Sequence, residues 1–241
     1  MKLIISLTTL PTRWDRIKPC LESLINQQYD DFEIHLNLPL KSETFDGFEE
    51  GTVGDIHPKI KTFYVKDLGP ITKVYYTLQR FKGTDTRIVS VDDDVIYDTN
   101  MLSQYKKWIK NHSNDTLGYA GLDIVEDNLK SVRDVDTPTE TDILEGYKSV
   151  CYLASQFKDD FFDEFYKTNV FDDPTLSGYL KLKEIKRLVI PHDYNKSNHW
   201  FISFPTISQI HNPISGCENL KVIGGDYRTN YTKFFEELNK F

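Results

Sequence analysis

Cysteine is scarce in this 241-residue sequence, and the few cysteines stand far apart, at Cys20, Cys151 and Cys217. Their odd number and the absence of a Cys-x-x-Cys pair exclude a disulfide framework and a cysteine-based zinc site. Long apolar runs are missing as well, and the opening stretch 2–7 is too short for a signal-peptide core or a membrane span. We therefore expect free thiols, no transmembrane segment and a soluble protein of the cytoplasm.

The sequence also lacks an excess of positive charge. It has 29 Lys and Arg against 37 Asp and Glu, a net charge of −8, and its basic residues are dispersed. Because a nucleic-acid-binding protein concentrates basic residues on one face, we expect no nucleic-acid partner. With 39% apolar and 27% charged residues, the composition is that of an ordinary globular protein.

Several catalytic motifs are absent too. There is no Gly-x-Ser-x-Gly, no His-Glu-x-x-His and no Walker loop, which disfavours the corresponding hydrolases. A phosphatase with an aspartate nucleophile would carry Asp-x-Asp after its first strand, where this chain has Thr8 and Thr9. Sugar-1-phosphate nucleotidyltransferases resemble one another in a Gly-rich loop at that point, and the segment 8–13 contains no glycine.

The first half of the chain alternates strand-like and helix-like segments. Apolar runs and apolar alternation predict strands at 2–7, 32–38, 60–65 and 87–91. Apolar residues at helical spacing begin at about 12, and Pro19 interrupts them, which predicts either a helix with a kink or a helix that starts near 18. The same spacing predicts a helix over 70–81 and another after Asp98, which we interpret as its N-cap. Strands interleaved with helices indicate an α/β fold with a mostly parallel, doubly wound central sheet and flanking helices.

The second half is less regular. We expect strands at 117–125, 150–154 and 185–190. We expect helices at 159–167, 174–183 and 229–238. The polar stretch 126–146 shows no clear period. No repeat, low-complexity tract or linker divides the chain, so we interpret residues 1–241 as a single domain.

An acidic triplet, Asp92-Asp93-Asp94, directly follows the strand predicted at 87–91. In an extended chain, side chains alternate, so Asp92 and Asp94 would project to one side and Asp93 to the other. A divalent cation would relieve their repulsion, and oxygen ligands suit Mg²⁺ or Mn²⁺. Ligands of open α/β sheets bind at the carboxyl ends of strands. The alternative is a solvated acidic turn, but the apolar flanks favour a metal site, since buried carboxylates need partners.

Three groups of segments together resemble the nucleotide-sugar-dependent glycosyltransferases of the GT-A fold, and specifically a small subgroup found in bacteria and large DNA viruses. The segments are 6–13 (SLTTLPTR) with 19–24 (PCLESL) and 27–28 (QQ); 67–73 (DLGPITK) with 91–94 (VDDD); and 145–147 (EGY), 171–174 (FDDP), 176–180 (LSGYL) and 186–191 (KRLVIP). The resemblance spans residues 3–191. It implies a Rossmann-like GT-A sheet, with a nucleotide-binding half at 1–98 and an acceptor half at 99–241.

The resemblance implies that the loop after the first strand holds the nucleotide. Thr8, Pro11 and Arg13 would then flank the base and ribose, although Arg13 could instead pair with the diphosphate, for which its planar fork is suited. A surface arginine in the first turn of a helix is the alternative. Lys73 lies just after Pro70, where a cation is unfavourable beside a helix N-terminus, so it indicates an anionic or nucleotide partner. A lysine that faces solvent is the alternative.

By the same resemblance, the acidic triplet is the Asp-x-Asp motif of these enzymes. Asp94 would coordinate the Mn²⁺ or Mg²⁺ ion that bridges the two phosphates, Asp92 would contact the ribose or the metal, and Asp93 would belong to the nucleotide-sugar site. The cation would neutralise the charge that develops on the departing nucleoside diphosphate.

The resemblance makes Asp173 the candidate catalytic base, with Asp172 as the alternative. Asp173 would take a proton from an acceptor hydroxyl as its oxygen attacks the anomeric carbon in an inverting displacement. The competing interpretation is a helix N-cap, because Asp173 is followed by Pro174, a favourable first helical residue.

Two further features of the site follow from the resemblance. Glu145, Gly146 and Tyr147 look like the loop that meets the acceptor or the donor sugar, with Gly146 permitting close approach and Tyr147 stacking on a sugar ring. A late histidine often completes the metal site in this fold. His211 is our choice, with His192 and His199 as alternatives, although each is more often a structural histidine.

We therefore expect a metal-dependent glycosyltransferase that moves a sugar from a nucleotide-sugar, with UDP as the nucleotide, to a glycan or glycoprotein acceptor. The alternatives are a non-catalytic nucleotide- or carbohydrate-binding domain, which would be favoured if Asp173 were only a cap, and a sugar-1-phosphate nucleotidyltransferase.

Overall fold

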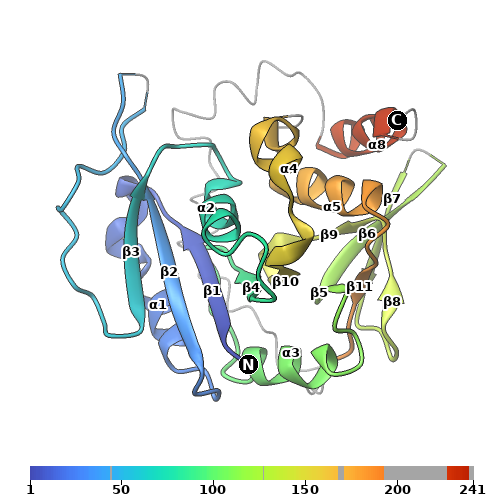
Figure 1. Cartoon of the computed structure of the whole chain (residues 1–241), viewed down its shortest axis with the longest axis horizontal. Helices are drawn as coiled ribbons and strands as arrows, with labels where there is room; N and C mark the ends of the chain where they lie inside the picture. The colour runs from blue at the N-terminus through green and yellow to red at the C-terminus, as the bar shows by residue number, and fades with distance from the viewer. Residues whose placement is uncertain (44, 127, 168–170, 193–226, 239–241) are drawn as a thin grey trace.

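Four parallel strands form one half of an eight-stranded sheet in the computed structural model, which describes residues 1–43, 45–126, 128–167, 171–192 and 227–238. The strands are β1 (Leu3–Thr8), β2 (Phe32–Pro39), β3 (Ile60–Val65) and β4 (Arg87–Ser90). They lie in the order β3-β2-β1-β4 (Figure 1). Nearly all residues of β1 and β2 are buried because helices cover both faces of the sheet. The strands predicted for this half are confirmed.

Three helices follow from the apolar periods of the first half. A 3₁₀ turn, η1 (Pro11–Arg16), leads into α1 (Lys18–Ile25), which has a proline in its first turn. α2 (Thr72–Arg80) precedes β4, and α3 (Met101–Ile109) follows it. The prediction that Asp98 caps α3 is wrong. Asn100 occupies the cap position, and Asp98 Oδ1 accepts the N–H of Asn100 at 2.7 Å, which forms a turn ahead of the helix.

The other half of the sheet is mixed in direction. β10 (Val150–Leu153) lies between β4 and β5 (Thr116–Gly118) and is antiparallel to both. β11 (Arg187–Val189) runs parallel to β5, and β8 (Thr139–Glu140) is antiparallel at the edge. β10 reverses direction because the chain enters it at the carboxyl end of β4, where Val150 pairs with Ser90. The sheet as a whole remains mostly parallel.

The predicted strand at 117–125 divides into two strands that belong to different sheets. β5 ends at Gly118, and β6 (Ala120–Val125) forms a three-stranded sheet with β7 (Asn128–Arg133) and β9 (Ile143–Leu144). β9 approaches Gly121 so closely that a Cβ there would lie 2.7 Å from Ile143 O. The polar stretch 126–146 therefore contains strands. The exposed side chains of β7 leave no apolar period in the sequence.

Helices of the second half pack on the sheet and on one another. α4 (Asp159–Asp163) is followed by the 3₁₀ turn η4 (Phe165–Lys167) and then by α5 (Asp172–Leu182). The 3₁₀ turns η2 (Gly146–Lys148) and η3 (Ala154–Gln156) flank β10. α8 (Tyr227–Leu238) lies against α5, with β7 beside it (Figure 1). The two helices meet at Gly178, where a Cβ would lie 2.6 Å from Leu238 Cδ1.

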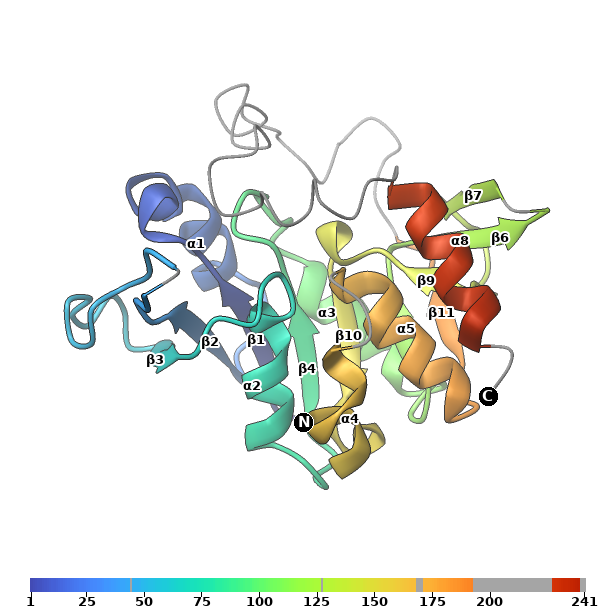
Figure 2. The same cartoon turned by 90° about the horizontal axis from the view of Figure 1, so that it is seen from above.

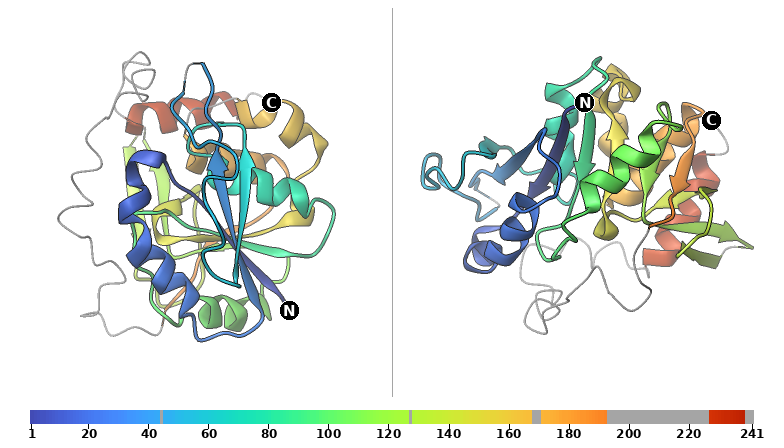
Figure 3. Two further views of the ribbon diagram at one scale, coloured as in Figure 1. Left: turned by 90° about the vertical axis from the view of Figure 1, so that its left-hand side faces the viewer. Right: turned by 90° about the horizontal axis from the view of Figure 1, so that it is seen from below.

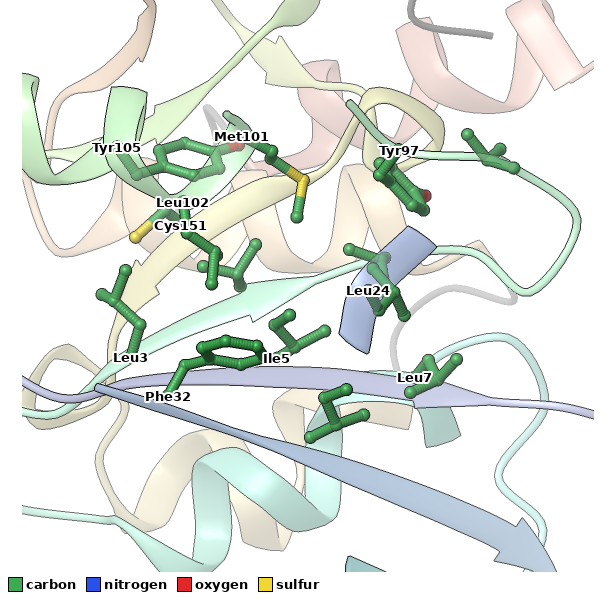
Figure 4. Close-up of a cluster of buried hydrophobic side chains, with 14 of the residues drawn as sticks. Leu3, Ile5, Leu7, Leu24, Phe32, Tyr97, Met101, Leu102, Tyr105 and Cys151 are labelled. Atoms are coloured by element: carbon green, nitrogen blue, oxygen red, sulfur yellow. The ribbon is translucent and has the colours of Figure 1, made fainter. Parts of the chain in front are cut away.

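The helices form two layers, one on each face of the large sheet. α1 and α3 pack on the face that carries Leu3, Ile5 and Leu7, and Figure 4 shows these side chains pointing toward them. α2, α4 and α5 pack on the face that carries Ile4 and Ile88. Figure 2 and the left panel of Figure 3 show α1 and α2 on opposite sides of the sheet. Within the described ranges, no helix is both long enough and apolar enough to cross a bilayer.

Candidate functional site

The carboxyl ends of β1 and β4 bring the loop after Thr8 and the acidic triplet to the same edge of the sheet. β1 and β4 are adjacent and parallel, and the N–H of Val91 donates to Ser6 O at 3.0 Å. β4 ends at Ser90, so the triplet lies in a turn beyond the strand. This is the edge at which open α/β sheets bind their ligands.

Asp93 points from the triplet toward η1. Its Oδ1 is 2.8 Å from Arg13 Nη1, and its Oδ2 accepts the Thr9 hydroxyl at 2.6 Å. The Asp93 side chain is only 8% exposed, so burial raises its pKa, whereas the Arg13 charge and the Thr9 bond act in the opposite direction. We call Arg13 and Asp93 the Arg13 pair. Thr9 was not among the predicted site residues, because a threonine after a strand gives no distinct signal.

The other two predicted residues of this loop also lie at the edge. The hydroxyl of Thr8, the last residue of β1, donates to Asn37 O of β2 at 2.7 Å, and Pro11 is the first residue of η1. Proline presets the φ angle of this turn. The loop thus crosses the end of the sheet with Arg13 aimed at the triplet.

Lys73 lies in the first turn of α2, and its ammonium group is surrounded by carboxylates. Nζ is 2.7 Å from Asp92 Oδ1 and 2.6 Å from Asp172 Oδ2. The side chain is 9% exposed. Burial lowers the pKa of Lys73, but Asp172, Asp92 and Asp173 outweigh it and hold that pKa well above its ordinary value. We call these four residues the Lys73 cluster. The anionic partner expected for Lys73 is thus present within the protein, although a role toward a nucleotide stays a prediction.

A buried polar network fixes the first turn of α2 over β1 and β2. The carbonyl oxygen of Lys73 accepts the Ser6 hydroxyl at 2.5 Å and the side-chain amide of Asn37 at 3.3 Å. Asn37 Oδ1 in turn accepts Arg80 Nη2 at 2.6 Å. Ser6 and Asn37 are fully buried, and each lies between two apolar residues of its strand, which was the signal available in the sequence. Because buried polar groups need partners, these bonds hold Lys73 in place.

Asp173 faces the 145–147 loop and does not cap its own helix. Phe171 occupies the N-cap of α5, and no side chain caps that end. Asp173 Oδ1 instead accepts the N–H of Gly146 at 2.9 Å. Burial and the neighbouring Asp172 raise the pKa of Asp173 well above its ordinary value. The interpretation of Asp173 as the N-cap of α5 is therefore wrong.

Gly146 is the point at which the loop meets the Lys73 cluster. A Cβ on Gly146 would lie 2.8 Å from Asp173 Oδ1 and 2.8 Å from Lys73 Nζ, so only glycine fits without a shift. Its neighbours Glu145 and Tyr147 are half-buried, and burial raises the pKa of both, that of Tyr147 to about 12. Glu145 Oε2 is 3.8 Å from Arg133 Nη2 of β7. The close approach expected at Gly146 thus involves protein groups in this structure.

Ser149 ends the turn that begins at Gly146, and its backbone is strained. Its φ of 77° and ψ of 148° lie near a region that is essentially restricted to glycine. Such a conformation costs about 1–3 kcal/mol and persists only where surrounding contacts enforce it. Strain of this kind concentrates at functional sites.

Tyr231 of α8 reaches the same region from the C-terminal end of the described chain. Its side chain is buried, and its ring centroid is 5.5 Å from that of Phe171. Burial and the charges of Asp173 and Asp172 raise the pKa of Tyr231. A lone tyrosine in the sequence gave no reason to select it.

The described residues fit a cation that arrives with phosphates better than a preformed metal cage. Asp92 is paired with Lys73 and Asp93 with Arg13, and Asp94 is half-buried. Within the described part of the chain, no three His, Cys, Asp or Glu side chains are grouped to hold a metal ion. Mg²⁺ commonly takes one or two carboxylates and completes its shell with water and substrate phosphates.

The histidines proposed for the metal fall into two groups. His211 and His199 lie outside the described residues. His192 is described, and its Nε2 is 3.3 Å from Asp134 Oδ1, which follows β7. His192 therefore has a carboxylate partner of its own in the structure.

The large mixed sheet, with helices on both faces and a charged edge at β1 and β4, defines an α/β fold. Solved structures of TarS from S. aureus share it. The structure of TarS 1–349 matches with a TM-score of 0.52 and 15% sequence identity over 78% of this chain. A second TarS structure, of a longer chain, matches with a TM-score of 0.53 and 15% sequence identity over 80% of this chain. TarS 1–349 in complex with UDP-GlcNAc matches with 0.51 and 14% over 99%.

These similarities establish the fold alone. The chain spans 58%, 36% and 71% of the three TarS chains, respectively. No protein-family model and no curated protein matches the sequence.

Proposed function

We propose that the protein is a glycosyltransferase that moves a sugar from a nucleotide-sugar, with UDP as the nucleotide, to a hydroxyl of a glycan or glycoprotein. The observation that carries the proposal is the Lys73 cluster, which joins the triplet after β4 to the carboxylate pair of α5. The GT-A resemblance and the fold shared with TarS, which has been solved with UDP-GlcNAc, support it.

The donor would lie over the carboxyl ends of β1 and β4. Thr8 and Pro11 would flank the base and ribose, and Arg13 would face the nucleotide while held by Asp93. A guanidinium group held in this way loses little freedom when it binds an anion. Lys73 would contribute a fixed positive charge beside the diphosphate, with Asp92 between them.

A Mn²⁺ or Mg²⁺ ion would be held by Asp94 and Asp92, with His211 as a further ligand. When bound, this cation neutralises the charge on the nucleoside diphosphate as it leaves. Because Lys73 pairs with Asp92, it would offset part of the negative charge that Asp92 places beside the diphosphate.

Asp173 would act as the general base, with Asp172 as the alternative. The acceptor oxygen forms a bond to the anomeric carbon, the bond from that carbon to the phosphate oxygen breaks, and the electron pair leaves with UDP. The acceptor proton passes to Asp173, and attack from the face opposite the diphosphate inverts the configuration. The N–H of Gly146 orients the carboxylate, and Glu145 and Tyr147 would border the sugars.

Calorimetric titration of UDP, GDP and TDP, each with and without Mn²⁺, tests the donor site. We expect UDP to bind with a dependence on Mn²⁺, and Asp94→Ala to remove that dependence. Asp30→Ala is the matched control, because Asp30 is exposed and precedes β2 at the opposite edge of the sheet. If none of the three nucleotides binds the folded wild-type protein, the donor site and the proposed function are wrong.

A further inference from the structure

Two buried tyrosines reach the turn 146–149, which comprises η2 and Ser149, from the segment after the acidic triplet. The hydroxyl of Tyr97 accepts the N–H of Asp92 at 2.8 Å and lies 3.3 Å from Tyr147 O, to which it donates. Tyr97 is 2% exposed, and its own N–H donates to Ser23 Oγ of α1 at 3.1 Å. One phenol therefore bonds both the backbone of the triplet and the backbone of the turn.

The second tyrosine, Tyr105, holds the strained end of the turn. Its hydroxyl lies 2.9 Å from both the carbonyl oxygen and the hydroxyl of Ser149, and its side chain is fully buried in α3. The N–H of Ser149 donates to Gly146 O at 2.9 Å and closes the turn. A serine at φ 77° relaxes to negative φ unless its neighbours prevent it, so the contacts with Tyr105 oppose that relaxation.

The position of the turn determines the position of the carboxylate that it contacts. The N–H of Gly146 points at Asp173 Oδ1, and the space beside it is already filled by Lys73 Nζ. If Ser149 relaxed, the direction of the Gly146 N–H would change and Asp173 would lose its backbone partner. Neither tyrosine needs to touch a substrate for this effect.

We propose that Tyr97 and Tyr105 are positioning residues. They clamp the turn 146–149 so that Gly146 holds the Asp173 carboxylate at a fixed position relative to the acidic triplet. The role rests on the proposed function, because it assumes that Asp173 and the triplet act on one substrate. Tyr97 sets the distance between the two backbones, and Tyr105 maintains the conformation of Ser149.

Tyr97→Phe and Tyr105→Phe test the clamp, with Tyr119→Phe as the matched control. Tyr119 is equally buried, its ring is 4.7 Å from that of Tyr105, and its hydroxyl donates to Met101 O. The probe reaction is the release of UDP from UDP-GlcNAc, with water or a supplied acceptor. We expect kcat to fall about 10- to 100-fold in both test variants, as for a misplacement of about 1 Å, with KM and UDP affinity within about twofold. Tyr119→Phe should retain the wild-type kcat.

A rescue experiment separates positioning from a general loss of stability. Glycine adopts φ 77° without strain, so Ser149→Gly combined with Tyr105→Phe should regain most of the lost kcat. Because glycine also relieves strain in the fold, urea denaturation of the same variants accompanies the kinetics. A purely structural role would predict that kcat falls and recovers only with the folded fraction, whereas positioning predicts the loss and recovery of kcat in protein that is fully folded under the assay conditions. Wild-type kcat in Tyr97→Phe and Tyr105→Phe would overturn the proposal.

Amide hydrogen exchange at Gly146 provides a readout that does not depend on activity. We expect exchange to be faster in Tyr97→Phe and Tyr105→Phe, and unchanged in Tyr119→Phe. Unchanged exchange in all three variants would overturn the clamp. A wild-type protein that binds no nucleotide would overturn the proposed function instead, so the two failures are distinguishable.

Discussion

The Arg13 pair and the Lys73 cluster lie at the same edge of the sheet but differ in charge balance and burial. In the Arg13 pair, one guanidinium group meets one carboxylate, and the Arg13 side chain is 25% exposed. In the Lys73 cluster, one ammonium group forms ion pairs with Asp92 and Asp172 and interacts with the charge of Asp173 at longer range. The Lys73 side chain is 9% exposed. The first is a balanced pair whose arginine is partly exposed, whereas the second holds excess negative charge around a buried ammonium group.

This difference underlies our proposal that the chemistry takes place at the Lys73 cluster. Burying uncompensated charge is unfavourable, so a protein retains such a cluster only where the surrounding structure enforces it. The polar network under Lys73 and the bond from Gly146 to Asp173 provide that enforcement. The Arg13 pair needs no comparable support, which is consistent with a role in binding rather than in proton transfer.

The largest effect on activity is expected from a change at Asp173, the proposed base in the Lys73 cluster. Asp173→Asn keeps the shape of the side chain and its bond to Gly146 but removes the capacity to accept a proton. We expect kcat to fall about 10²- to 10⁴-fold, the range for a lost general base, with UDP affinity nearly unchanged. Steady-state kinetics with UDP-GlcNAc, together with UDP calorimetry, measures both quantities. Asp172→Asn is the comparison variant, and if it is the more damaging of the two, the roles of the pair are reversed.

Removing the ammonium group of Lys73, which Asp92 and Asp172 share, is expected to have the next largest effect. Lys73→Met leaves buried carboxylates without a partner, and we expect a loss of about 3–5 kcal/mol in the free energy of unfolding. Arg13→Met should cost less, about 1–3 kcal/mol, because Asp93 keeps its bond to Thr9 and Arg13 is partly exposed. Urea denaturation of both variants makes the comparison. Equal losses would show that the two regions are energetically alike.

The strands of the first half could be predicted because each carries its signal in its own residues. Apolar residues in β1 and β4 are followed at once by turn-forming or acidic residues, so both the strands and the location of the triplet could be inferred. The direction of β10 could not be predicted, since a strand's own pattern does not state which neighbour it joins. β7 is polar and exposed, and it is defined by its pairing with β6.

The candidate site likewise has features that could be predicted from the sequence and features that could not. The sequence and the resemblance indicated Lys73, Asp92, Asp172, Asp173 and Gly146 as members, but not which of them are paired. The pairing of Lys73 with Asp172 spans about a hundred residues, and no local pattern encodes it. Ser149 is harder still, because a positive φ is anticipated at glycine and is imposed here on a serine by Tyr105.

His35 of β2 is a buried ionisable residue away from the site, and its pKa gives a further comparison with Lys73. It is 3% exposed, and burial together with the nearby Arg80 lowers its pKa to about 4. A neutral buried histidine thus contrasts with the charged Lys73. Between pH 4 and 6.5 the unfolded chain binds the additional proton, so the stabilisation is complete above pH 6.5 and is lost as the pH falls toward 4.

At about 1.4 kcal/mol per pKa unit, His35 should account for roughly 2–3 kcal/mol of the fall in unfolding free energy across that window. Urea denaturation at a series of pH values measures it, and His35→Gln should flatten the slope. A slope that persists in His35→Gln would assign the pH dependence of this window to other groups. Glu33 is not one of them: bonds from Lys2, Lys61 and His35 lower its pKa to about 2 despite its burial, so its stabilisation is lost only below about pH 4.5.

Gly146→Ala should have the smallest effect, and it addresses the Lys73 cluster at its most crowded point. The added Cβ would lie 2.8 Å from both Lys73 Nζ and Asp173 Oδ1, so at least one of these groups must move. We expect kcat to fall about 10-fold or somewhat more because the base is displaced, with a stability loss of about 1 kcal/mol. Gly54→Ala is the matched control, since Gly54 is exposed and a Cβ there meets nothing within 4 Å. Gly146→Ala could instead match Gly54→Ala in both kcat and the free energy of unfolding. The Lys73 cluster would then have room to relax around the added Cβ, and close packing would no longer distinguish it from the Arg13 pair.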